Sequence, residues 1–188
     1  MGKVIFITGG VRSGKSAFAE NIAKDIYIEN NSEKLIYIAS GVAFDDEMEK
    51  RIRRHMQDRE ASEIKWTTIE CVNELPKEIG TFQRNSVILW DCITTWLSNV
   101  LYKTEVIQTS KRFVEIENYL NQLKQQIMMW KRQGLAVILV SNEVLDEQVS
   151  KFKEVNLYRR ILGSLHQWLV SICDEAYEMD YSLIRQWK

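Results

Sequence analysis

The stretch that decides the fold is Val4-Ile5-Phe6-Ile7-Thr8-Gly9-Gly10-Val11-Arg12-Ser13-Gly14-Lys15-Ser16. Its first residues are apolar and β-branched, as in a buried strand, and a glycine-rich turn follows directly. The spacing Gly9-x-x-x-x-Gly14-Lys15-Ser16 is that of a P-loop, in which backbone N–H groups and a helix N-terminus bind phosphates. The alternative is a glycine turn with an incidental lysine. A strand before the turn and a helical pattern after it favour the P-loop, with Lys15 on the β- and γ-phosphates and Ser16 on Mg²⁺.

Three further apolar runs predict strands, and helical patterns fill the gaps between them. The runs are short, continuous and β-branched, as expected for strands buried on both faces of a parallel sheet; they are residues 35–39, 87–90 and 136–141. One helical pattern reaches Trp130 and ends at Gly134, and a second reaches Ile172 before a predicted edge strand at residues 176–181. This alternation predicts an α/β fold. We expect a single P-loop nucleotide-binding catalytic domain spanning residues 1–188.

Composition excludes several classes of protein. The 188 residues include 25 basic and 26 acidic ones, so no global charge points to nucleic acid. No run approaches the roughly 18 apolar residues that span a bilayer, and the N-terminus lacks a signal-peptide pattern. Cys71, Cys92 and Cys173 are isolated and predict reduced packing residues. We therefore expect a cytoplasmic protein.

An acidic residue stands at the end of the run 87–90, where a P-loop enzyme needs a carboxylate near the metal. Asp91 is the candidate for holding Mg²⁺, directly or through water. An aspartate in this position is also a common helix N-cap, and the residues after it look helical. Both roles remain open, and both can hold at once.

A histidine lies within a charged helical pattern at residues 45–59. His55 shares a stripe with apolar residues, as a buried structural histidine would. Arg51 and Arg59 lie one turn either side of it, and Arg54 is adjacent. Neighbouring cations disfavour protonation, and a neutral imidazole can attack phosphorus while arginines bind the phosphate oxygens. A nucleophilic role for His55 is therefore a hypothesis beside the structural one.

The ordered set of motifs resembles the bifunctional adenosylcobinamide kinase/adenosylcobinamide-phosphate guanylyltransferase family of cobalamin synthesis. A P-loop alone is shared by many families, whereas the ordered set is specific to this one. The matching positions are residues 8–16, Glu20, residues 37–40, 46–48 and 51–52, His55, Arg59, residues 66–70 and 91–97, Asn99 and residues 141–144.

The resemblance implies a RecA-like P-loop NTPase fold of three layers with a mostly parallel central sheet, and two reactions. The P-loop would serve phosphorylation of a cobinamide hydroxyl by ATP or GTP, with Mg²⁺ held by Ser16 and Asp91. His55 would carry GMP, taken from GTP as a phosphoramidate and passed to cobinamide phosphate. The implied nucleotide-binding residues include Gly9, Gly10, Val11, Arg12, Ser13, Gly14, Lys15, Ser16, Arg51, Arg54, Arg59, Glu70 and Asp91. Trimers are implied, with clefts between subunits.

The second half of the chain departs from the family pattern. After Val144 the usual Gly-x-Gly-x-Val-Pro is replaced by Leu145-Asp146-Glu147-Gln148-Val149-Ser150, and an asparagine-glutamine pair by His166-Gln167. Corrinoid recognition is the property these changes affect most. Two alternatives therefore stay open: a P-loop kinase without guanylyl transfer, and a degenerate nucleotide-binding module without turnover. The sequence does not distinguish ATP from GTP as phosphoryl donor.

Overall fold

One sheet forms the centre of the molecule. The computed structural model describes residues 2–41, 49–50, 53–54, 56–57, 59, 61–82, 84–144 and 149–188. In these parts of the chain seven strands pair in the order β3-β2-β4-β5-β1-β6-β7. The strands are β1 (Lys3–Gly9), β2 (Lys34–Ala39), β3 (Trp66–Glu70), β4 (Ser86–Asp91), β5 (Ala136–Val140), β6 (Glu175–Asp180) and β7 (Leu183–Gln186). All neighbours are parallel except β6 and β7.

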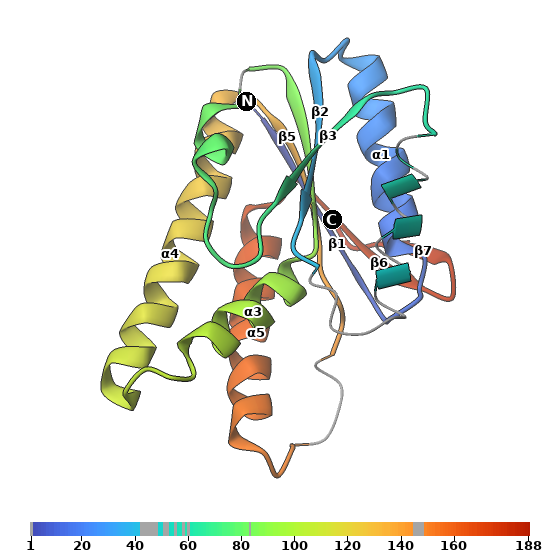
Figure 1. Ribbon diagram of the computed structural model, residues 1–188. Coiled ribbons are helices and arrows are strands. Elements are labelled where there is room, and N and C mark those ends of the chain that lie inside the picture. The colour runs from blue at the N-terminus through green and yellow to red at the C-terminus, as the bar shows by residue number, and fades with distance from the viewer. Residues whose placement is uncertain are drawn as a thin grey trace.

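Helices cover both faces of this sheet, which gives the expected three-layer α/β fold. Helix α1 lies on one face and α3, α4 and α5 on the other (Figure 1). Their bounds are α1 (Lys15–Glu29), α3 (Ile93–Thr104), α4 (Thr109–Gln133) and α5 (Lys153–Ile172), with a short 3₁₀ helix η1 (Lys77–Thr81) before β4. No helix of the described residues is both long and apolar enough to cross a membrane.

The four apolar runs form the strands that were predicted from them. Their side chains alternate between two cores: Val4 and Phe6 of β1 belong to the core under α3, α4 and α5, and Ile5 and Ile7 to the core under α1. Because both faces are covered, every position of β5 is buried. All three cysteines are free and buried, as expected.

The C-terminal edge of the sheet differs from the prediction. The strand expected at the edge, β6, instead pairs with β1 on one side and β7 on the other. Strands β3 and β7 were not predicted, because they lack an apolar run. In β7 all four residues are exposed, and in β3 three of the five residues are exposed and two are half-buried.

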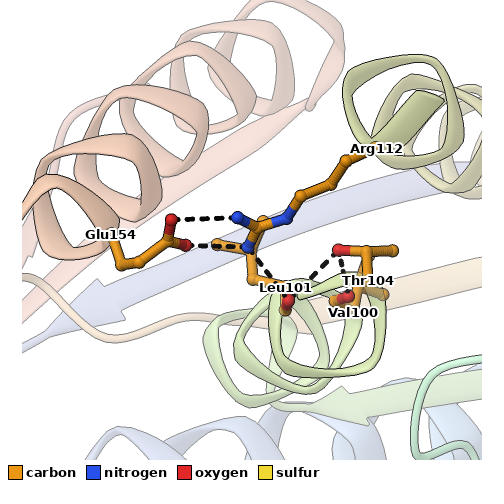
Figure 2. Close-up of polar contacts among 5 residues, drawn as sticks. All are labelled: Val100, Leu101, Thr104, Arg112 and Glu154. Carbon is orange, nitrogen blue, oxygen red and sulfur yellow. Dashed lines mark hydrogen bonds and ion pairs between the residues drawn. The ribbon is translucent and has the colours of Figure 1, made fainter. Parts of the chain in front are cut away.

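A charged cluster joins the three helices on one face (Figure 2). Arg112 of α4 donates to both carboxylate oxygens of Glu154 in the first turn of α5, over 2.9 and 2.7 Å, and to the carbonyl oxygen of Leu101 over 3.2 Å. This contact raises the pKa of Arg112 and lowers that of Glu154, chiefly through their mutual hydrogen bonds. Thr104 donates its hydroxyl to the carbonyl oxygens of Val100 and Leu101 within α3. The bidentate pair fixes α5 against the other two helices.

Candidate active site

The P-loop joins β1 to α1 through backbone conformations that suit glycine. Gly9 has φ 151° and Gly14 has φ 90°, in the left-handed region that side chains disfavour. A Cβ atom on Gly9 would lie 2.2 Å from the carbonyl oxygen of Met179. Arg12 also has a positive φ, 61°, without being glycine. The loop therefore turns tightly enough to form a concave backbone surface before α1.

Lys15 lies at the mouth of this loop. Its side chain is only 4% exposed, and Nζ donates to the carbonyl oxygen of Gly10 over 2.9 Å. The first backbone bond of α1 runs from Phe18 N to Gly14 O, so the N–H groups before Phe18 have no carbonyl within the helix. An ammonium group and a helix N-terminus in one concave turn are suited to a phosphate.

The β6–β7 turn supports the P-loop from outside, a contact that the sequence did not reveal. The backbone N–H of Ser182 donates to the carbonyl oxygen of Ser13 over 3.1 Å. A Cβ on Gly14 would lie 3.4 Å from Ser182 Oγ. The turn residues Tyr181 and Ser182 both have positive φ, 44° and 64°. At Gly14 the 3.4 Å distance would be an ordinary contact, so glycine is required there by its φ of 90°, whereas at Gly9 strand β6 leaves no room for a Cβ.

Asp91 ends β4 at the same edge of the sheet. The helix-cap alternative for it is wrong, because β4 continues through Asp91 and the N-cap of α3 is Cys92. Its Oδ2 instead accepts a hydrogen bond from the Tyr37 hydroxyl over 3.2 Å. Strand β5 separates β4 from β1, which sets Asp91 about 10 Å across the sheet from the P-loop strand. That gap is suited to a hydrated cation and phosphates.

The segment after β5 is tied by hydrogen bonds to β1 on one side and to α3 on the other. Ser141 N donates to the carbonyl oxygen of Ile7, and Glu143 N to that of Gly9, each over 2.9 Å. Asn142 N donates to Thr94 Oγ1 at the start of α3 over 3.1 Å. The ends of β1, β4 and β5 thus form one connected edge.

A buried histidine stands behind this edge. His166 of α5 is 8% exposed, and its Nε2 lies 2.7 Å from Ser141 Oγ. Its ring packs edge-on against Phe6, with centroids 5.2 Å apart. Burial lowers the pKa of His166 to about 4, so the ring is neutral at physiological pH.

Arg59 makes contacts that the helical pattern alone did not predict. Its guanidinium lies 3.7 Å from the Tyr37 ring centroid, and Nη1 is 3.5 Å from Glu20 Oε1 on α1. The side chain is 6% exposed. Desolvation and the charge of Asp91 raise the pKa of Tyr37 above its ordinary value. Arg59, Tyr37 and Asp91 therefore form one chain of contacts along the sheet edge.

Of the remaining predicted site residues, some belong to the part of the chain that the structure describes and others do not. His55 and Arg51 lie outside the described residues, as does the altered segment 145–148. Arg54 is helical and exposed. Glu70 is the last residue of β3, which lies four strands from β1 in the sheet. A single chain therefore does not place Glu70 beside its own P-loop.

A three-layer α/β fold with a P-loop directly after strand β1 defines a nucleotide-binding enzyme of the P-loop class. The model of the family described as "Cobinamide kinase / cobinamide phosphate guanyltransferase" matches residues 5–181, and the chain belongs to this family.

Curated relatives agree with this assignment. The chain is 32% identical over 178 residues to the bifunctional adenosylcobalamin biosynthesis protein CobU of Escherichia coli strain K12, and 31% identical to CobU of Salmonella typhimurium. Each alignment covers 93% of both sequences. The protein CobP of Pseudomonas aeruginosa is 30% identical over 90% of this chain and 88% of its own.

Proposed function

We propose that this enzyme phosphorylates adenosylcobinamide with a nucleoside triphosphate and then transfers GMP from GTP to the product, giving adenosylcobinamide-GDP. The observation that carries the proposal is the P-loop with buried Lys15 at the connected edge of β1, β4 and β5, in a chain of the cobinamide kinase/guanyltransferase family. The relatives' names as bifunctional adenosylcobalamin biosynthesis proteins support both half-reactions.

In the kinase step the P-loop would hold the β- and γ-phosphates through its backbone N–H groups and Lys15. Ser16 and Asp91 offer the oxygen ligands that Mg²⁺ prefers, and Mg²⁺ keeps several waters and substrate oxygens of its own. When bound, Mg²⁺ would neutralise charge on the phosphates.

In the second step His55 would act as nucleophile. A ring nitrogen forms a bond to the α-phosphorus of GTP as the bond to pyrophosphate breaks. An oxygen of cobinamide phosphate then attacks that phosphorus, and the nitrogen–phosphorus bond breaks to release the free histidine. Arg51, Arg54 and Arg59 come from the same segment and are proposed to bind phosphate oxygens. The proposal places these reactions in the cytoplasm and within a single domain.

The test is an intact-mass measurement after incubation with GTP and Mg²⁺, run in parallel with ATP. We expect an acid-labile adduct of GMP mass with GTP, and its loss in His55→Ala. His166→Ala is the matched control, because it removes the other histidine of the chain and should leave the adduct in place. If no adduct forms, or if an adduct still forms in His55→Ala, the result would contradict the role of His55 as the carrier of GMP. Phosphorylation of cobinamide without an adduct would identify a kinase only.

A further inference from the structure

Asn142 follows β5 at the centre of the edge that β1, β4 and β5 form together. Strand β5 lies between β1, which leads into the P-loop, and β4, which ends at Asp91. The backbone N–H groups on either side of Asn142 donate to the carbonyl oxygens of Ile7 and Gly9, so the pairing with β1 continues past the end of β5. The backbone of Asn142 is therefore held level with the start of the P-loop, about 5 Å from the neighbouring chain.

The alternation of side chains along β5 determines the face on which the Asn142 carboxamide lies. Ile138 and Val140 belong to the core under α1, and Leu139 between them belongs to the opposite core. Asn142 comes two residues after Val140 and so faces the α1 side of the sheet (Figure 1). Its Nδ2 lies 4.0 Å from Sγ of Cys92, which belongs to the same core. The carboxamide therefore shares its face with α1 and the P-loop.

Asp91 lies on this face as well, on the other side of β5. Its carboxylate accepts the hydroxyl of Tyr37, whose side chain belongs to the core under α1. Val140 is in register with Asp91, so Asn142 lies about 7 Å further out along the sheet edge. A triphosphate held by the P-loop, with its cation beside Asp91, would bring its terminal group to the level of Asn142.

The carboxamide of Asn142 is fixed in position and available to a ligand. The side chain is half-buried, and the backbone N–H donates to Thr94 Oγ1 over 3.1 Å. Among the residues that the structure describes, the carboxamide makes one weak hydrogen bond, from Nδ2 to Cys92 Sγ. Nδ2 carries a second N–H, so it can donate to a phosphate oxygen as well. A donor held in place where charge develops during a reaction stabilises the transition state.

We propose that Asn142 is a further catalytic residue of the kinase step, in which Nδ2 donates to an oxygen of the terminal phosphoryl group. This inference rests on the proposed phosphorylation of adenosylcobinamide. In that step the acceptor hydroxyl oxygen forms a bond to the γ-phosphorus as the bond to the bridging oxygen breaks. The nucleoside diphosphate leaves with the electron pair, and the hydroxyl proton passes to water. Guanylyl transfer reacts at the α-phosphorus, so it should depend far less on Asn142.

The first test uses nucleotides without a corrinoid. Calorimetry with Mg²⁺ compares ADP with AMP-PNP, and GDP with GMP-PNP, in the full chain, Asn142→Ala and Asn142→Asp. We expect the full chain to prefer the triphosphate analogue, and Asn142→Ala to lose about tenfold of that preference at unchanged diphosphate affinity, as for a hydrogen bond to a charged group. Asn142→Asp should lose more, because a carboxylate repels the phosphoryl oxygens. Asn118→Ala alters an exposed asparagine of α4 and should keep the preference.

The second test compares the two reactions in one variant. In Asn142→Ala we expect kcat for corrinoid phosphorylation to fall about 100-fold, as when one donor to a developing charge is removed. The amount of GMP adduct formed with GTP should stay within about twofold of that in the full chain, because a twofold change corresponds to only about 0.4 kcal/mol.

The outcomes separate this inference from the function it rests on. No triphosphate preference in the full chain, an unchanged preference in Asn142→Ala, or equal losses of diphosphate and triphosphate affinity would overturn the role of Asn142. Loss of the preference in a protein that phosphorylates no cobinamide would support the phosphate contact and reject the proposed kinase step. Asn142→Asp keeps the size of the side chain, so it carries the test if Asn142→Ala lowers the temperature of unfolding.

Discussion

The buried ring of His166 makes stability depend on pH. Its pKa falls from 6.5 to about 4 on folding, so the unfolded chain binds more protons between these values. The contribution is present above pH 6.5 and is lost as pH falls towards 4, by about 3 kcal/mol at most. In His166→Asn, which can still hydrogen-bond Ser141, we expect a flatter fall of the free energy of unfolding over this range. Urea titrations at several pH values measure it; identical slopes in both proteins would contradict the prediction.

The sequence predicted the roles of several site residues but not all of their contacts. The expected site residue Lys15 could be named because its role depends on local spacing, and the structure places it at the loop. Asp91 was named too, but its hydrogen bond with Tyr37 depends on β2 and β4 being neighbours. Arg59 was expected beside phosphate, whereas its stacking on Tyr37 arises from tertiary packing. The role of His55 stays a prediction, because that residue lies outside the described part of the chain.

At the scale of elements, the end of α4 offers a clean test of backbone strain. Gly134 caps the helix with φ 90°, and its N–H donates to the carbonyl oxygen of Lys131 over 3.3 Å. A Cβ there would meet nothing within 4 Å, so Gly134→Ala should cost only the strain of a left-handed alanine, about 1 kcal/mol. Gly80→Ala is the matched control, since it too has open space and no positive φ. Urea unfolding compares the two, and an equal effect would contradict the argument.

Strands could be predicted from the sequence where burial on both faces gives a continuous apolar run. Strands β1, β2, β4 and β5 were recognised because both faces are buried and the runs are apolar. Strands β3 and β7 carry polar, exposed residues, and the turn before β7 uses Tyr181 and Ser182 at positive φ in place of Asn-Gly or Asp-Gly. Without that signal a two-residue hairpin cannot be read from the sequence. The support of the P-loop by this hairpin was hidden for the same reason.

The order of the strands in the sheet decides which site residues a single chain can bring together. The ends of β1, β5 and β4 are adjacent, so the P-loop, Asp91 and the segment after β5 meet within one copy. Tyr37 of β2 reaches this site through its hydrogen bond with Asp91, and Arg59 stacks on the Tyr37 ring. Apolar side chains remain exposed at the β7 edge of the sheet, including Leu183 at 74% and Trp187 at 64%. Exposed apolar surface of this kind is typical of contacts between copies.

Assembly is the last property we predict, and it follows from the family resemblance together with that exposed edge. We expect a trimer of 22.1 kDa chains, about 66 kDa, by sedimentation equilibrium at micromolar concentration. Burial of apolar surface should make the mass insensitive to salt, because screening weakens contacts between charges and not apolar ones. Measurements at low and high salt test this, with a dilution series as the control for weak association. A mass of one chain at every concentration would contradict the trimer and would require each active site to form within a single copy.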